Sequence, residues 1–227
     1  MNPLVIASNM HNEMHQAEEW LQNVREMAQN RILIVDSGST DGTVEFFNSE
    51  GVTVVHSKII QEEGYGPARN HLRECSKAHF PDAEWMMYLD GDERIGEEDF
   101  HTLRFLCDYL DPRFEVIALP RLDMDVNGKP VNDLHLHPDF QARLSRLDAP
   151  VYYVRRLHEQ ITNHLALYAE LTNPKILHYH RQTDKKTRNH VGKLCAKLHA
   201  EDEFGHTYPE HHKEAYYREL LEKEGLE

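Results

Sequence analysis

Short apolar runs alternate with helix-like segments through the first half of the chain. In the intervening segments apolar residues recur at i, i+3, i+4 and i+7, the spacing of one buried helical face; Ala17, Trp20, Leu21 and Val24 are an example. Strands buried on both faces and joined by helices form largely parallel sheets. The pattern therefore predicts an α/β fold with a doubly wound, mostly parallel, Rossmann-like sheet flanked by helices. The predicted strands cover residues 3–8, 31–35, 52–55, 85–89 and 116–119.

The pattern changes after residue 119. Asn127-Gly128 is typical of a hairpin turn, and extended segments are expected at 140–146, 151–155 and 176–179. Beyond Thr183 the pattern becomes helical, with a last charged helix around 214–224. We expect one domain over residues 1–182, with a ligand-binding half at 1–118 and a second half at 119–182, followed by a helical extension at 183–227.

Composition narrows the classes of partner. The net charge of −14 argues against nucleic-acid binding, which needs a basic surface. The three cysteines lack C-x-x-C spacing, which indicates free thiols in a reducing compartment. No stretch is apolar enough for a transmembrane segment, so a cytoplasmic location is expected.

The central apolar run ends in Asp90-Gly91-Asp92. In open parallel sheets ligands bind beyond the carboxyl ends of the strands, and paired carboxylates there suit Mg²⁺ or Mn²⁺ shared with a phosphorylated ligand. A solvated acidic turn is the plain alternative. An EF-hand calcium loop is excluded, because Arg94, Ile95 and His101 occupy positions that need an oxygen ligand, Gly and Glu.

Polar motifs follow two further strands, at residues 9–13 and 36–41, so three motifs meet at one edge of the predicted sheet. The first strand–helix turn lacks the G-x-G-x-x-G fingerprint, and no P-loop motif occurs. Without these backbone cradles, a metal on Asp92 is the expected means of holding phosphates.

These motifs resemble family 2 glycosyltransferases of the GT-A fold. The similarity lies in the segments VDSGSTDGT (35–43), GPARN (66–70) and LDGDE (89–93). Segments 138–144, 157–159 and 176–179 are further similar to the bacterial lipopolysaccharide-core β-1,4-glucosyltransferase subgroup. The resemblance covers roughly residues 3–180.

The resemblance implies an inverting, metal-dependent transfer of a sugar from a nucleotide donor, a UDP-sugar by preference, to a glycan, lipid-linked or protein acceptor. Asp36 would bind the nucleobase with help from Arg69, and Asp90 would contact the ribose or the metal. The full set of implied donor-binding residues is Asn9, Glu13, Asp36, Ser39, Arg69, Asp90 and Gly91.

The same resemblance implies a metal held by Asp92 and by a later histidine. His178 is our choice, while His180 and His164 lie nearby in sequence and stay open as alternatives. For the general base we choose Glu159, with Asp139 as the runner-up.

The first motif departs from the family pattern, since His11 stands where an aromatic residue usually precedes Asn-Glu. An imidazole can still stack on a nucleobase. Two other functions remain open: a non-catalytic sugar-nucleotide or glycan-binding module, and a nucleotidylyltransferase. The second would carry a Gly-rich, Arg-containing loop after the first strand, which this chain lacks.

Overall fold

The computed structural model describes residues 3–131, 139–163, 167–179 and 185–200. The helices are α1 (Met14–Ala28), α2 (Thr43–Ser49), α3 (Ile59–Glu62), α4 (Tyr65–His79), α5 (Phe100–Tyr109), which follows a 3-10 turn at Glu97–Asp99, and α6 (Lys185–Ala200). The strands are β1 (Leu4–Met10), β2 (Ile32–Asp36), β3 (Thr53–His56), β4 (Trp85–Tyr88), β5 (Glu93–Ile95), β6 (Phe114–Asp123), β7 (Asp139–Arg146), β8 (Tyr152–Val154), β9 (Gln160–Thr162), β10 (Leu167–Glu170) and β11 (Ile176–His178).

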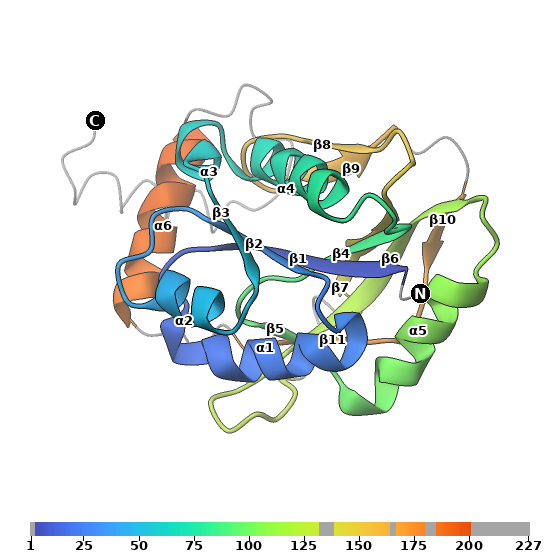
Figure 1. Ribbon diagram of the computed structural model, residues 1–227. Helices are drawn as coiled ribbons and strands as arrows, with labels where there is room; N and C mark the ends of the chain where they lie inside the picture. The colour runs from blue at the N-terminus through green and yellow to red at the C-terminus, as the bar shows by residue number, and fades with distance from the viewer. Residues whose placement is uncertain (1–2, 132–138, 164–166, 180–184, 201–227) are drawn as a thin grey trace.

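One large sheet runs through the molecule in the order β3-β2-β1-β4-β7-β6-β11-β5, and β10 pairs with β6. Strands β1 to β4 are mutually parallel where they pair, while β7 is antiparallel to both neighbours. The mostly parallel, doubly wound α/β sheet is thus confirmed. Strands β1 to β4 come from the first half of the chain, and β6, β7, β10 and β11 extend the sheet, with β10 and β11 each parallel to β6 (Figure 1).

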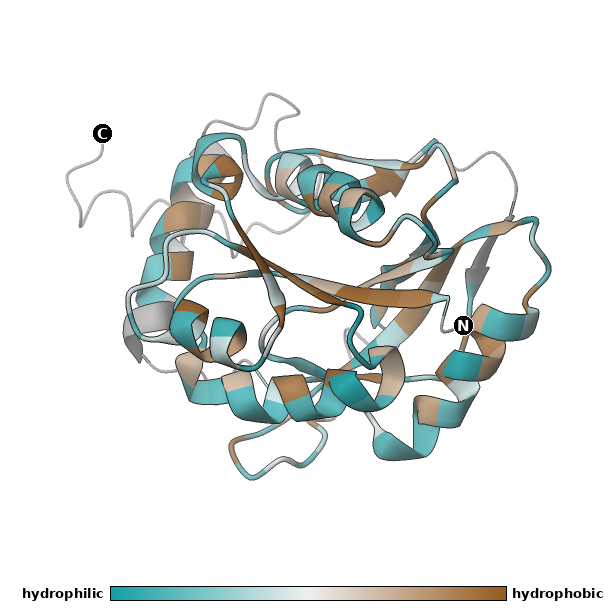
Figure 2. Cartoon of the chain, viewed as in Figure 1, coloured by the Kyte–Doolittle hydropathy of each residue, from teal (hydrophilic) through white to brown (hydrophobic). Residues whose placement is uncertain are grey.

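Helices cover both faces of this sheet, because successive strand residues point to opposite sides. Ile6 and Ile34 pack on one face with α1 and α5 side chains such as Trp20 and Leu103. The intervening residues, such as Val35, face the other way and pack with α4. In Figure 1, α1, α2 and α5 lie below the sheet and α4 lies above it, and Figure 2 shows the strands between them as the most hydrophobic part.

The order of the strands places β11, which comes from the second half of the chain, beside the Asp90-Gly91-Asp92 turn. Strand β5 begins directly after that turn and pairs antiparallel with β11, with Glu93 opposite His178. The Tyr179 backbone N–H donates to the Asp92 carbonyl at 2.7 Å. This short ladder fixes where the β11 side chains stand relative to the turn.

A second segment, residues 154–159, is held on the N-terminal turn of α4. The backbone N–H groups of Tyr65 and Gly66 donate to the carbonyls of Arg156 (2.7 Å) and Arg155 (3.1 Å). A Cβ on Gly64 would lie 2.5 Å from the Arg156 carbonyl oxygen, and one on Gly66 would overlap that of Arg155. The two glycines therefore permit the close backbone contact that positions 154–159 over the sheet edge.

We expect Gly66→Ala to lower the free energy of unfolding by about 1–3 kcal/mol, because the added methyl group meets rigid backbone. The matched control is Gly96→Ala, where a Cβ would meet only the movable carboxylate of Glu98 at about 3.0 Å. Urea unfolding measures both. Equal, small effects of the two substitutions would contradict the close packing of the segment on α4.

Most elements agree with the sequence predictions, with shifted ends. The predicted strand at 116–119 continues through Pro120 to Asp123, and the Asn127-Gly128 turn is present, with a single antiparallel bridge between Met124 and Pro130. Helix α3 and strands β5, β9 and β10, all of them short, were not predicted from the sequence. The predicted helix at 214–224 lies outside the described residues. No helix in the described ranges has the length and apolar character needed to cross a membrane.

Candidate active site

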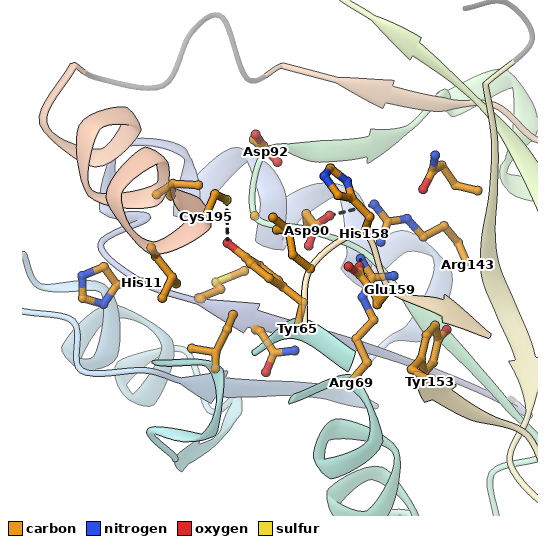
Figure 3. A pocket seen from close by; sticks show the side chains of 18 of the residues that line it. His11, Tyr65, Arg69, Asp90, Asp92, Arg143, Tyr153, His158, Glu159 and Cys195 are labelled. Atoms are coloured by element: carbon orange, nitrogen blue, oxygen red, sulfur yellow. Dashed lines mark hydrogen bonds and ion pairs between the residues drawn. The ribbon is translucent and has the colours of Figure 1, made fainter. Parts of the chain in front are cut away.

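A cavity of about 830 Å³ lies at the carboxyl edge of the parallel strands (Figure 3). It extends from the ends of β1 and β2, past the turn after β4, to β6, β7, β11 and the 154–159 segment. Nine of the donor, metal and base candidates predicted from sequence line this cavity: Asn9, Glu13, Arg69, Asp90, Gly91, Asp92, Asp139, Glu159 and His178. The cavity lining does not include Asp36 or Ser39, and His164 and His180 lie outside the described residues.

Asp90 belongs to a buried ion-pair network at the centre of the cavity. Its carboxylate accepts hydrogen bonds from Tyr88 Oη (2.5 Å) and Arg143 Nη2 (2.7 Å), and the same guanidinium nitrogen lies 2.6 Å from Glu93. Burial alone would raise the pKa of Asp90, but the guanidinium groups of Arg143 and Arg69 offset it and hold that pKa well below its usual value. Asp90 is therefore a fixed, ionised acceptor facing the cavity.

Asp92 and His178 form a pair beside this network. His178 Nε2 lies 3.4 Å from Asp92 Oδ2, and His178 Nδ1 bonds to Asp123 Oδ1 at 2.6 Å. A carboxylate on the far ring nitrogen is the usual outer support of a metal-binding histidine, because it orients the ring. Asp123 lies at the end of β6, has no motif of its own and was not predicted from the sequence.

These residues fit a hard divalent cation shared with a diphosphate. Among the described residues, no group of three or more His, Cys, Asp or Glu side chains is arranged to hold a metal ion. Mg²⁺ and its analogues, however, are commonly held by one or two protein ligands and complete their shell with substrate phosphates and water. Asp92 and His178 supply such a partial set.

The His178 contacts have a consequence for stability. Burial alone would lower the pKa of His178, but the hydrogen bonds to Asp123 and Asp92 raise it to about 9. The protonated ring therefore stabilises the folded state; this contribution is complete below about pH 6.5 and is lost as the pH rises through 9. In EDTA, we expect it to amount to on the order of 2 kcal/mol.

Urea unfolding of the wild type and His178→Gln between pH 6 and 9.5 measures this contribution as the difference between the two. The difference should shrink as the pH rises, whereas the exposed His79→Gln control should run parallel to the wild type. A constant difference across this range would show that His178 is not protonated in the metal-free fold.

Glu13 is a second carboxyl group of the cavity and is half-buried. Burial and the negative charges of Asp92 and Asp90 raise its pKa to about 8. Its Oε2 atom has no hydrogen-bond partner in the described part of the chain, and a Cβ on Gly91 would lie 2.9 Å from Glu13 Cγ. The glycine between the two aspartates thus makes room for Glu13. The Glu13 carboxyl group is placed to exchange a proton with a polar ligand in the cavity.

Asp36 and Ser39 organise the loop after β2. The Asp36 carboxylate accepts hydrogen bonds from the backbone N–H groups of Gly38 (2.9 Å) and Ser39 (3.2 Å). Ser39 Oγ accepts the backbone N–H of Asn12 at 2.8 Å. Direct contact of either side chain with a donor, as the resemblance implies, stays a prediction.

Both candidate bases are paired with arginines. Arg69 forms an ion pair with Glu159 and stacks on Tyr88, with its guanidinium carbon 3.9 Å from the ring centroid. Asp139 bonds to Arg121 at 2.8 Å. The Arg69–Glu159 pair joins α4 to the 154–159 segment within the cavity (Figure 3).

Helix α6, in the segment expected to be an extension, contributes four residues to the cavity lining: His190, Val191, Leu194 and Cys195. The His190 ring stacks on His11, with centroids 4.3 Å apart and planes at 20°. One face of His11 therefore already has an aromatic partner. The spacing of Val191, Leu194 and Cys195 predicted a helix with one apolar face, but not that this face lines the cavity.

Comparisons with known proteins agree with this architecture. Residues 9–106 match the family model described as glycosyl transferase family 2. The glycosyltransferase SunS of Bacillus subtilis and its counterpart in Bacillus phage SPbeta are each 24% identical over 218 residues, which is 93% of this chain and 47% of the relative. The chain thus spans about half the length of these curated relatives.

Solved structures show the same fold at low identity. The structure of S. aureus TarS residues 1–349 with UDP-GlcNAc aligns with 96% of this chain and 71% of its own, at a TM-score of 0.53 and 14% identity. Mannosyl-3-phosphoglycerate synthase from Rubrobacter xylanophilus aligns with 87% of this chain and 72% of its own, at a TM-score of 0.50 and 11% identity. Residues 9–106 thus match a glycosyl transferase family 2 domain, set in a chain with the GT-A fold.

Proposed function

We propose that this chain transfers a sugar from a nucleotide-sugar donor, a UDP-sugar, to a hydroxyl group of an acceptor. One observation carries the proposal: Asp90, Asp92 and His178, from two distant segments, meet Asn9 and Glu13 in a single cavity of about 830 Å³. Cavities of this size accommodate small molecules and cofactors. The family 2 match and the TarS complex with UDP-GlcNAc support the class of donor.

The sheet order suggests how a donor would lie. The turn after β4 and the end of β11 carry Asp92 and His178, so the diphosphate belongs there. The nucleoside would extend toward β1 and β2, and the sugar and acceptor toward β6, β7 and the 154–159 segment. Mn²⁺ or Mg²⁺ bound by Asp92 and His178 would neutralise the charge that develops on the leaving diphosphate.

Individual residues of the cavity have separate roles in this proposal. Asp90, held by Tyr88 and Arg143, would accept hydrogen bonds from the donor. Glu159, with Asp139 as the alternative, would take the proton of the attacking hydroxyl, in a single displacement with inversion. Because Arg69 already pairs with Glu159, an incoming acceptor hydroxyl would share or replace that contact.

The similarity of segments 138–144, 157–159 and 176–179 to lipopolysaccharide-core glucosyltransferases supports a saccharide hydroxyl as the acceptor. The experiment is release of UDP from a panel of UDP-sugars in the presence of Mn²⁺ and saccharide acceptors, with anomeric configuration read by NMR. UDP release that depends on an acceptor and gives an inverted product supports the proposal.

A non-catalytic binding module is the alternative. It predicts UDP binding without release of UDP from any donor, and it predicts no effect of Glu159→Gln on binding. If Glu159→Gln instead lowers turnover and leaves UDP affinity unchanged, the base assignment is supported. If only Asp139→Asn does so, the base is Asp139.

A further inference from the structure

Gln61 has a hydrogen-bonding arrangement that the proposed catalytic roles do not use. It lies on α3 and lines the cavity together with Ile60 and Ser37. Its Nε2 atom donates to the Ser37 carbonyl at 2.6 Å. A carbonyl oxygen accepts hydrogen bonds and cannot donate them, so the amide atom that faces Ser37 must be the nitrogen. The amide oxygen, Oε1, therefore points away from the Ser37 carbonyl.

That oxygen is buried and has no hydrogen-bond partner in the described part of the chain. Asn9 also lines the cavity, and its Nδ2 atom is likewise buried and without a partner among the described residues. A buried polar atom left unpaired is costly, so such atoms at a cavity wall indicate a ligand that would pair with them. The cavity wall thus offers one acceptor, the Gln61 oxygen, whose orientation the bond to Ser37 fixes, and one donor, the Asn9 amide nitrogen.

The position of these atoms in the fold indicates which part of a nucleotide-sugar donor they would contact. Ser37 follows β2 and Asn9 lies near the end of β1, whereas Asp92 and His178 follow β4 and β11. With the diphosphate at Asp92, the nucleobase is the part that extends over β1 and β2. This step rests on the proposed function.

We propose that Gln61 selects the nucleobase by accepting a hydrogen bond from a ring N–H group, as presented by N3 of uracil and N1 of guanine. Cytosine and adenine carry an unprotonated acceptor nitrogen at the equivalent position, which would face the Gln61 oxygen. Turning the amide over would not relieve this conflict, because the oxygen would then face the Ser37 carbonyl and the 2.6 Å bond would be lost. The unpaired Asn9 amide can donate to a neighbouring carbonyl oxygen of the base.

Asp36, the residue that the resemblance assigns to the nucleobase, is occupied differently. Its carboxylate accepts two backbone N–H groups of its own loop and does not line the cavity. Gln61 bonds to the carbonyl of the next residue, Ser37, and does line it. Reading of the base thus falls to the amide of Gln61, with Asp36 holding the loop that orients it.

The test is calorimetric titration of the full chain with UDP, CDP and GDP in Mn²⁺, using the wild type, Gln61→Leu and a control, Gln22→Leu, at an exposed glutamine of α1 outside the cavity. The wild type should bind UDP at least about tenfold more tightly than CDP. Gln61→Leu should weaken UDP binding by about tenfold and leave CDP nearly unchanged, and Gln22→Leu should behave as the wild type. GDP that binds as tightly as UDP, with the same dependence on Gln61, would identify guanine as the base.

A second measurement needs only the wild-type protein. UDP methylated at N3 lacks the N–H group, so it should bind at least about tenfold more weakly than UDP. Equal binding of UDP and CDP, or equal losses for both in Gln61→Leu, would overturn the role of Gln61 while leaving the proposed function intact. Failure of the wild type to bind any of these nucleotides would overturn both.

Discussion

Asp92→Asn is expected to lower Mn²⁺-dependent turnover of the UDP-sugar by about 10²-fold or more. In the proposed function Asp92 and His178, which lie 3.4 Å apart, hold the cation, and the amide would replace a charged ligand with a neutral one of the same shape. Loss of an outer support of a metal ligand already costs about 10–100-fold, so loss of a direct ligand should cost at least as much. Initial rates of UDP release across a Mn²⁺ series measure the effect.

The structure supplies graded controls for this substitution. Asp123→Asn removes only the carboxylate that orients His178, so we expect a smaller loss, about 10–100-fold, that high Mn²⁺ partly restores. Asp108→Asn changes an exposed acid on α5 and should leave the rate unchanged. Asp92→Asn that retains wild-type Mn²⁺ dependence would show that the cation is held elsewhere.

Arg143→Met is expected to lower the free energy of unfolding by about 3–5 kcal/mol at pH 7. The Arg143 side chain is 1% exposed and pairs with both Asp90 and Glu93, the latter fully buried. Methionine fills similar space but removes the cation nearest to both carboxylates, and leaves Glu93 only the longer contact with Arg121 Nη1 at 3.7 Å. A buried charge without a close partner is far costlier than a missing contact. Urea unfolding measures the loss.

The pH dependence separates this cause from a packing defect. Protonation relieves unpaired carboxylates, so the deficit of Arg143→Met should shrink as the pH falls from 7 to 5. Arg113→Met, at an exposed arginine paired with Asp111, should leave the midpoint nearly unchanged. A deficit below about 1 kcal/mol, or one that is the same at both pH values, would contradict the charge-network account.

The first half of the fold was predictable from sequence for a physical reason. Strands β1, β2 and β4 are buried on both faces, so their apolar runs stand out, and the helices between them have one buried stripe. Strands β5, β9, β10 and β11 are three or four residues long, too short for a period to show. Among these, only β11 was predicted, as an extended segment at 176–179.

The candidate site divides in the same way. Asp90 and Asp92 interrupt an apolar run, so sequence alone marks them as functional candidates. Arg143 and Asp123 look like ordinary strand residues, and only pairing of β7 with β4 and of β11 with β6 brings them to the turn. Gln61 was missed because its role depends on one bond to a backbone carbonyl, which no residue pattern encodes.

The most direct test of the central claim is calorimetric titration of the wild-type chain with UDP, in Mn²⁺ and again in EDTA. Glycosyl transfer from a UDP-sugar at the Asp92–His178 pair predicts binding in Mn²⁺ that weakens at least about tenfold in EDTA. Absence of UDP binding under both conditions would contradict the assignment of this cavity as a nucleotide-sugar site.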